Sequence, residues 1–115
     1  DILHASCVAV DGRGLLILGP SGAGKSALAL RLIALGAALV SDDRTMVAAK
    51  DGRLTASCPN ADLRGLIEAR GVGILRAPFV DRAVLALAID LNRQETDRLP
   101  AERSVTFLGT PLSLV

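Results

Sequence analysis

One stretch of the sequence matches the pattern Gly-x-x-x-x-Gly-Lys-Ser/Thr, the P-loop pattern of phosphate binding. It consists of Gly19, Pro20, Ser21, Gly22, Ala23, Gly24, Lys25 and Ser26. Glycines let backbone amides turn inward toward phosphate oxygens, and a following helix adds the partial positive charge of its N-terminus. Lys25 is expected to reach the β- and γ-phosphates, and Ser26 to ligate Mg²⁺. The pattern therefore predicts a nucleoside triphosphate site, with ATP and Mg²⁺ as the expected ligands.

A glycine-rich turn without any ligand would show the same letters, and the flanking segments decide between these interpretations. Residues 15–18 are fully apolar, as in a strand buried on both faces. Residues 25–35 have leucines at helical spacing, and Gly36 can end that helix as its C′ residue. A strand before the loop and a helix after it are the context that favours phosphate binding.

Asp42 and Asp43 follow the next apolar run, residues 38–40. Residues 15–40 then read as strand, helix and strand, one βαβ unit with a right-handed crossover. In an open α/β sheet, ligands lie beyond the carboxyl ends of the strands, so the acidic pair is expected beside the loop. One carboxylate could hold Mg²⁺ and the other could take a proton from an attacking hydroxyl. A solvated Asp-Asp turn is the alternative, and the sequence does not distinguish the two aspartates.

Other candidate residues carry weaker signals. His4 is the only histidine, and by itself it is more typical of a strand end than of a catalyst. Glu68 and Arg70 share one face of an alternating segment, and they could form either a site or an ion pair. Cys7 and Cys58 lack the spacing of metal ligands, so we expect reduced thiols and no zinc.

The composition is that of one compact domain, residues 1–115. Half of the residues are hydrophobic but only two are aromatic, so the core must be aliphatic. The formal net charge of +1 and the shortage of aromatic residues give no reason to expect nucleic acid or an anionic membrane as a partner. No apolar run reaches the roughly 18 residues that span a bilayer. A cytoplasmic location is the expectation.

The rest of the chain is predicted to be mostly strand. A turn is expected over residues 11–14 and a charged surface connection over residues 92–103. The expected strands are residues 6–10, 46–49, 53–56, 84–91, 105–108 and 112–115, with hairpins at 46–56 and 105–115.

Taken together, the motifs resemble the catalytic domain of HPr kinase/phosphorylase. The likeness covers about residues 3–76 and rests on the glycine-rich loop, on Asp42-Asp43-Arg44, and on the specific run from Ile67 to Ile74, IEARGVGI. It implies an α/β fold, a P-loop-containing mixed β-sheet with one main helix after the P-loop, similar to the nucleotide domain of PEP carboxykinase. The chain looks like a short form restricted to that domain.

The resemblance also implies residue roles. Lys25 matches the phosphate-binding lysine, and Ser26 and Glu68 match the magnesium ligands. One of the two aspartates, with Asp43 favoured over Asp42, takes the proton from the target serine and returns it in the reverse, phosphorolytic reaction.

Two of the weaker candidates gain a role in the same way. His4 falls where the family keeps a catalytic-site histidine ahead of the loop. Arg70 matches the arginine of the signature, which would neutralise charge on the phosphates.

The partner implied is an HPr-like phosphocarrier of the sugar phosphotransferase system, phosphorylated on serine to regulate carbon metabolism. Longer relatives form hexamers, so a homo-oligomer is a further expectation. Two other functions stay open at this point: a P-loop phosphotransferase with a small-molecule acceptor, and a nucleotide sensor without turnover.

Overall fold

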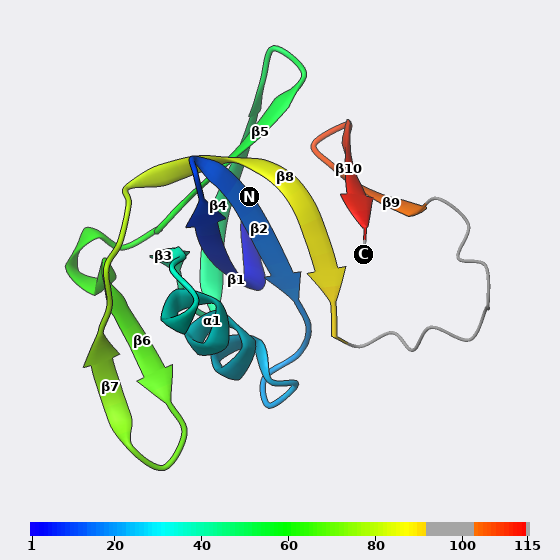
Figure 1. Ribbon diagram of the computed structural model, residues 1–115. Coiled ribbons are helices and arrows are strands. Elements are labelled where there is room, and N and C mark those ends of the chain that lie inside the picture. The colour runs from blue at the N-terminus through cyan, green and yellow to red at the C-terminus, as the bar shows by residue number, and fades with distance from the viewer. Residues whose placement is uncertain (92–102, 115) are drawn as a thin grey trace.

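The computed structural model describes residues 1–91 and 103–114, and in this range it has one α-helix among ten strands (Figure 1). The helix is α1 (Lys25–Ala34), and a short 3₁₀ helix spans Ala61–Leu63. The strands are β1 (Ile2–Val10), β2 (Arg13–Leu18), β3 (Ala38–Ser41), β4 (Arg44–Lys50), β5 (Arg53–Ser57), β6 (Leu66–Ala69), β7 (Gly73–Arg76), β8 (Arg82–Asp90), β9 (Arg103–Phe107) and β10 (Thr110–Leu114). The prediction of one helix followed mostly by strands is confirmed. The surface connection expected over residues 92–103 lies outside the described residues, except for Arg103 in β9.

Five strands pair into a closed ring rather than an open sheet. Strand β1 is antiparallel to β2 and β4, β4 to β5, and β5 to β8, while β8 returns to pair in parallel with β2. Closure is possible because the long strand β8 offers one edge to β2 and the other to β5. The sheet is mixed, as predicted, but the expectation of an open sheet is wrong.

The interior of this ring is packed with small side chains. Its buried residues include five alanines with an exposed fraction of 6% or less, namely Ala5, Ala9, Ala56, Ala83 and Ala88. A ring of five strands leaves little room inside, so small residues let its walls approach to normal packing density. The core is aliphatic, as the shortage of aromatic residues predicts.

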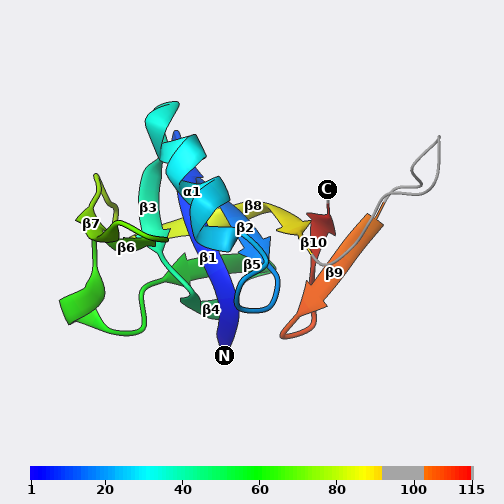
Figure 2. The same cartoon turned by 90° about the horizontal axis from the view of Figure 1, so that it is seen from below.

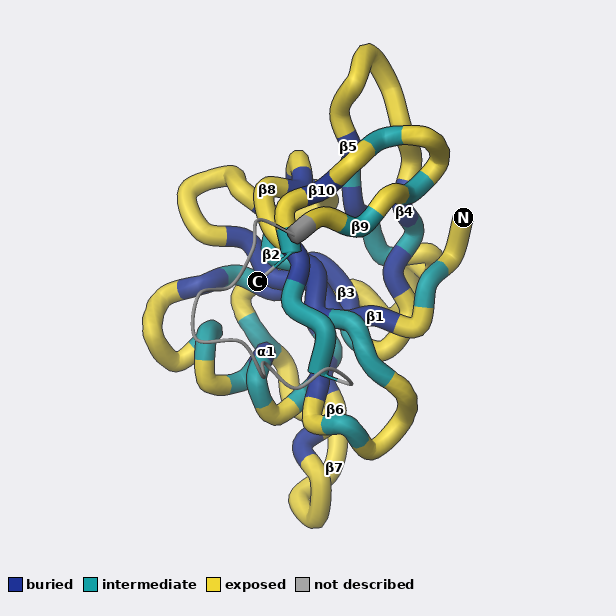
Figure 3. The backbone as a smooth tube through the Cα atoms, turned by 90° about the vertical axis from the view of Figure 1, so that its right-hand side faces the viewer, coloured by how far each residue is buried: buried dark blue, intermediate teal, exposed yellow. Residues whose placement is uncertain are grey.

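Helix α1 covers the outer face of the ring over β1, β2 and β3 (Figure 2). The fully buried Ala29 allows the helix to approach β1 closely, and Val8 and Ile17 lie beneath it. In β2, Leu16 packs inside the ring and Ile17 packs under the helix, which confirms a strand buried on both faces. Figure 3 shows that the buried residues gather where these strands meet, whereas the outlying turns are exposed.

The helix ends as the sequence predicts. Gly36 has a φ of 114°, and its amide donates to the carbonyl of Ile33 at 3.0 Å. The amide of Ala37 donates to the carbonyl of Leu32, also at 3.0 Å. This pair of bonds is a Schellman motif, with Gly36 at C′.

Two tight turns differ from the prediction in length. Asp11 and Gly12 have φ values of 51° and 78° and form a two-residue type I′ turn, so Arg13 and Gly14 already belong to β2. The last hairpin turns at Leu108 and Gly109, because Thr110 and Pro111 pair with β9. The hairpin around residues 50–52 turns at Asp51 and Gly52, within the predicted segment.

The βαβ unit is present but its two strands are not neighbours. Strands β2 and β3 both pair antiparallel with β1, which lies between them. Beyond β3, the chain continues along the same edge of β1 as β4. Pairing along this edge is interrupted at Asp42 and Asp43, between β3 and β4. The acidic pair therefore lies within a strand ladder and does not follow a free strand end.

The β6–β7 hairpin forms a separate sheet beside the helix (Figure 1). Ile67 on β6 is buried and packs in the cluster under α1. Behind the hairpin, Phe79 makes a bridge to Leu39 of β3, and the amide of Ala77 donates to the carbonyl of Gly65 at 2.8 Å. These contacts hold the hairpin against α1 and β3.

Candidate active site

The glycine-rich loop joins β2 to α1 in a backbone conformation that needs its glycines. Gly22 and Gly24 have φ values of 84° and 101°, in the left-handed region that side chains disfavour. A Cβ at either position would meet nothing within 4 Å, so the requirement comes from backbone angle and not from space. Within the described part of the chain, the amides of Gly22, Gly24, Lys25 and Ser26 donate to no backbone carbonyl. Unpaired amides at a helix N-terminus attract an anion.

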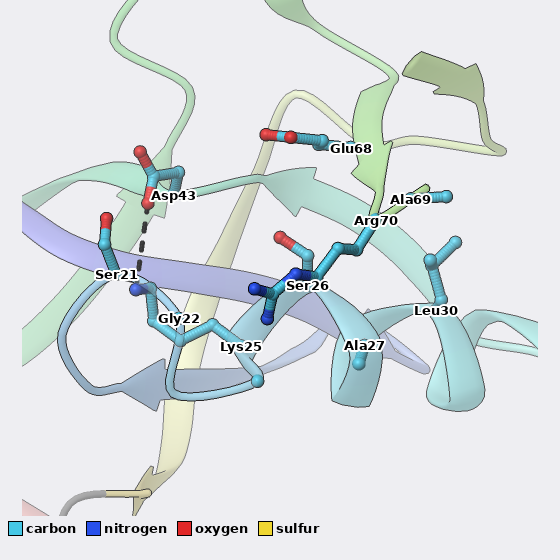
Figure 4. A pocket seen from close by; sticks show the side chains of 11 residues that line it. Ser21, Gly22, Lys25, Ser26, Ala27, Leu30, Asp43, Glu68, Ala69 and Arg70 are labelled. Atoms are coloured by element: carbon cyan, nitrogen blue, oxygen red, sulfur yellow. Dashed lines mark ion pairs between the residues drawn. The ribbon is translucent and has the colours of Figure 1, made fainter. Parts of the chain in front are cut away.

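Lys25 brings a positive charge to the same place. Its side chain is only 4% exposed, and its ammonium donates to the carbonyl of Pro20 at 3.0 Å. The Nζ atom also lies 3.7 Å from Asp43 Oδ1, an ion pair visible in Figure 4. The loop thus surrounds a cation whose partner is one member of the acidic pair.

Asp42 is held by three hydrogen bonds from three different elements. Its Oδ1 accepts from Ser26 Oγ of α1 at 2.7 Å and from Ser6 Oγ of β1 at 2.9 Å. Its Oδ2 accepts from the amide of Glu68 in β6 at 3.1 Å. Hydrogen bonds to an ionised carboxylate are stronger than neutral ones, so Asp42 fastens the helix, the ring and the hairpin together.

Asp43 stands at the centre of a tight turn. The amide of Arg44 donates to the carbonyl of Asp42 at 2.7 Å, and Asp43 between them has a φ of 64°. A hydrogen bond across three residues with a positive central φ is a γ-turn, a rare and strained conformation. The turn leaves the Asp43 side chain 55% exposed, and its amide donates to Ser6 Oγ at 3.1 Å.

A cavity of about 650 Å³ collects most of the predicted site residues. The glycine-rich loop and the first turn of α1 form one side, and Asp43 borders it next to Lys25. Glu68 and Arg70 line it from the β6–β7 hairpin, and Figure 4 shows the Arg70 side chain directed toward Ser26. One cavity therefore collects Lys25, Ser26, Asp43, Glu68 and Arg70. Asp42 does not line it but accepts a hydrogen bond from Ser26.

His4 is not among the residues that line this cavity. It is exposed on β1 and is paired in register with Arg44 of β4. It lies two residues before Ser6 and so faces the same side of the strand. The structure thus places His4 opposite the residue that follows the acidic pair, but outside this cavity.

A second cavity, of about 440 Å³, lies against the acidic pair and shares only Asp43 with the lining of the first. Its walls include the apolar side chains of Ile2, Pro59 and Leu63, and Arg44 adds a cation. Asp43 borders both cavities. A group bound in one cavity and a group bound in the other would meet at this carboxylate.

The donors around Ser26 suit a hard divalent cation. The Ser26 hydroxyl, the Asp42 carboxylate and the Glu68 carboxylate offer only oxygen, the element that Mg²⁺ prefers. Within residues 1–91 and 103–114, no group of three or more His, Cys, Asp or Glu side chains forms a metal cage by itself. Mg²⁺ usually binds through one or two protein groups together with substrate phosphates, so this donor set fits it.

Sequence reasoning missed Ser6, which contacts both aspartates. The available signal was a single hydroxyl within the otherwise apolar run from Ala5 to Val10. Neither its burial nor its partners could be read from that pattern, because the partners lie 36 and 37 residues away.

The cysteines are both free thiols. Burial inside the ring raises the pKa of the Cys7 thiol to about 12, so this group stays neutral. Among the described residues, no helix has both the length and the apolar character needed to cross a bilayer.

Comparison with known proteins identifies similar sequences and a similar fold. A family model described as HPr Serine kinase C-terminal domain matches residues 1–106. The HPr kinase/phosphorylase of Leptothrix cholodnii is 42% identical, over 97% of this chain and 38% of its own length. The HPr kinase/phosphorylase of Streptococcus equi subsp. zooepidemicus is 37% identical, over 96% of this chain and 39% of its own length. The chain therefore spans less than two fifths of these relatives.

A solved structure agrees with these sequence matches. The Hpr(Ser) kinase/phosphatase from Coxiella burnetii superposes with a TM-score of 0.86 at 30% sequence identity. The superposition covers 99% of this chain and 83% of that one. The ring, the helix and the loop between them are thus shared with a protein of this name.

Proposed function

The chain belongs to the HPr serine kinase C-terminal domain family, and on that premise we propose that it is a protein serine kinase. It transfers the γ-phosphoryl group of ATP, with Mg²⁺, to a serine of an HPr-like phosphocarrier. The proposal rests mainly on one observation. Lys25 Nζ and Asp43 Oδ1 form an ion pair of 3.7 Å in one cavity, beside free backbone amides. A phosphate-binding cation and a candidate base lie within reach of one reacting group.

In the proposed reaction, the glycine-rich loop binds the phosphates through its amides and Lys25. Asp43 accepts the proton of the seryl hydroxyl while the seryl oxygen forms a bond to the γ-phosphorus. The bond between that phosphorus and the β–γ bridging oxygen breaks, and ADP leaves with that electron pair. Arg70 lies where it could neutralise charge on the transferred group.

Ser26 and Glu68 would hold the metal, with Asp42 next to Ser26. A magnesium ion bound there would neutralise phosphate charge. Asp42 would also keep the Ser26 hydroxyl in place through their 2.7 Å hydrogen bond.

Two observations favour Asp43 over Asp42 as the base. The oxygens of Asp42 already accept three hydrogen bonds, which leaves them poorly placed to take a substrate proton. Asp43 instead has an exposed carboxylate at the tip of a strained turn. Strained backbone often marks a functional residue.

The second cavity supports a protein acceptor. Because Asp43 borders both cavities, an acceptor segment in the second one would present its hydroxyl to the base from the side away from the loop. Its apolar walls and Arg44 fit a peptide segment better than a small polar metabolite. A nucleotide sensor would need neither this cavity nor a base.

Three further features belong to the proposal. The phosphorolytic direction would use the same proton on Asp43 in reverse, as the relatives' name kinase/phosphorylase suggests. The chain would encounter both substrates, ATP and the phosphocarrier, in the cytoplasm. Assembly into homo-oligomers stays a prediction.

Incubation of the chain with labelled ATP, Mg²⁺ and purified HPr tests the proposal. We expect label on a serine of HPr, and a loss of about 10²- to 10⁴-fold in rate for Asp43→Asn, since this is the usual contribution of a general base. Asparagine tolerates a positive φ and so preserves the turn, which makes it a clean substitution. Nucleotide binding with an unlabelled carrier would contradict the kinase function.

A further inference from the structure

We propose that Ser6 is a positioning residue that holds the base Asp43 in place for phosphoryl transfer. The inference rests on the proposed function, but it concerns a residue to which neither the motifs nor the family resemblance assigns a role. The serine lies on β1, far in sequence from the acidic pair, and it contacts both members of that pair.

The Ser6 hydroxyl makes two bonds of opposite sense. It donates to Asp42 Oδ1 at 2.9 Å and accepts from the amide of Asp43 at 3.1 Å. Its side chain is fully buried, so water cannot replace either partner. One hydroxyl thus fixes the carboxylate of the first aspartate and the backbone of the second.

The position of Ser6 in the ladder explains why a hydroxyl is needed. On the edge of β1, Cys7 pairs with Ser41 and His4 pairs with Arg44, while Asp42 and Asp43 lie between these pairs and belong to neither β3 nor β4. The γ-turn rotates the amide of Asp43 out of the regular ladder. Ser6 Oγ takes the place of the missing carbonyl acceptor, so the strained turn keeps its hydrogen bond.

The direction of the Asp43 side chain follows from this bond. A residue at a positive φ has few other allowed conformations nearby, and it persists only where its surroundings enforce it. The carbonyl of Asp43 is held separately, because it accepts from the amide of Ala5 at 3.0 Å. With both backbone groups of Asp43 fixed by β1, its carboxylate is directed into the cavity beside Lys25.

A neighbouring hydroxyl provides a matched control. Thr45 is also fully buried, and its Oγ1 donates to the carbonyl of Ala5 at 2.7 Å. It joins β4 to β1 two residues beyond Asp43, and its hydroxyl bonds to the Ala5 carbonyl and to neither aspartate. Thr45→Val therefore removes a buried hydroxyl from the same ladder without removing a bond to Asp42 or Asp43.

The experiment compares Ser6→Ala, Ser6→Thr and Thr45→Val with the wild-type chain in HPr phosphorylation and ATP binding. Ser6→Ala is expected to lower kcat by roughly 10- to 100-fold, since displacement of a reacting group by about 1 Å costs this much. Its Kd for Mg-ATP should stay within about threefold of wild type, because the loop is intact. Ser6→Thr keeps a hydroxyl and should recover most of kcat. Thr45→Val should lose stability but keep kcat.

Amide hydrogen exchange at Asp43 gives a second readout that does not depend on turnover. Ser6→Ala should accelerate exchange at this amide by about tenfold or more, because its acceptor is gone. Thr45→Val should leave it slow. A Ser6→Ala chain with kcat within twofold of wild type, or a Thr45→Val chain that loses kcat equally, would overturn the inference. If the wild type labels no HPr, the kinase function fails, and exchange at Asp43 then decides the role of Ser6 by itself.

Discussion

The hydroxyl of Ser26 donates to Asp42 Oδ1 at 2.7 Å, and this bond joins the first turn of α1 to the end of β3. The same carboxylate also accepts hydrogen bonds from Ser6 Oγ and from the amide of Glu68. The loop, the ring and the hairpin therefore meet at one half-buried carboxylate beside the cavity. The predictions below follow from this arrangement and from the packing that supports it.

Ser26→Ala should weaken binding of Mg-ATP by about tenfold or more. The substitution removes a hydroxyl that interacts with a charged group, and such an interaction typically contributes about 1.5–3 kcal/mol. Affinity for ATP measured in excess chelator should change much less. Calorimetric titrations with and without Mg²⁺ separate the two effects. Ser26→Thr keeps the hydroxyl and should bind as wild type does. An equal loss with and without the metal would argue against a magnesium ligand.

Removal of Asp42 should destabilise the fold, whereas removal of the Asp43 charge should not. Asp42→Ala leaves the fully buried Ser6 hydroxyl without its acceptor, at a cost of about 1–3 kcal/mol, and also removes the acceptor of the exposed Glu68 amide. Asp43→Asn removes an ion pair whose carboxylate is 55% exposed, and the buried Lys25 ammonium keeps the Pro20 carbonyl as its acceptor, so the loss should be about 0–1 kcal/mol. Urea unfolding of both variants measures the difference. Equal stabilities would mean that Asp42 does not fasten the three elements together.

Gly65→Ala should destabilise the protein more than Gly71→Ala. Both glycines have a positive φ, 77° and 80°, so both substitutions carry backbone strain of about 1–2 kcal/mol. Only at Gly65 would the new Cβ also meet a ring, 2.6 Å from Phe79 Cδ1. Thermal unfolding of the two variants isolates that clash. Matching midpoints would show that the Phe79 ring moves aside and does not hold β6, the strand that carries Glu68.

Alkaline pH should destabilise the chain through Cys7. Burial raises the pKa of this thiol from 9.0 to about 12, so the folded state binds a proton that the unfolded state has released. The stabilisation is fully present below pH 9 and is lost as the pH rises toward about 12. Over this window, urea unfolding should show a steeper loss for wild type than for Cys7→Ala. Cys58→Ser, at the half-buried thiol, should follow wild type.

The second cavity should affect the protein substrate and not the nucleotide. Leu63 is 53% exposed on its wall, and Leu63→Asp is expected to raise the KM for HPr by about tenfold, as burial of one apolar side chain contributes about 1.5–3 kcal/mol. The Kd for Mg-ATP should not change. Leu35→Asp, at a leucine 84% exposed that lines neither cavity, is the control. Unchanged KM in both variants would place the acceptor elsewhere.

The sequence by itself determined the local features. The glycine-rich loop, the helix after it, its Gly36 terminus and the Asp-Gly turns each depend on a few consecutive residues, so their patterns predict them directly. The order of the motifs also determined the family. Lys25, Ser26, Asp43, Glu68 and Arg70 were all found from motifs, and they share one cavity.

Only the tertiary structure decided how the strands close and which groups touch the acidic pair. The return of β8 to β2 joins residues about 70 positions apart, and no periodicity within a strand encodes its partner. The distinction between Asp42 and Asp43, and the part played by Ser6, depend on hydrogen bonds of 2.7 to 3.1 Å across four elements. Such bonds form or fail with a small change of register, and register is fixed by the packing of the whole ring.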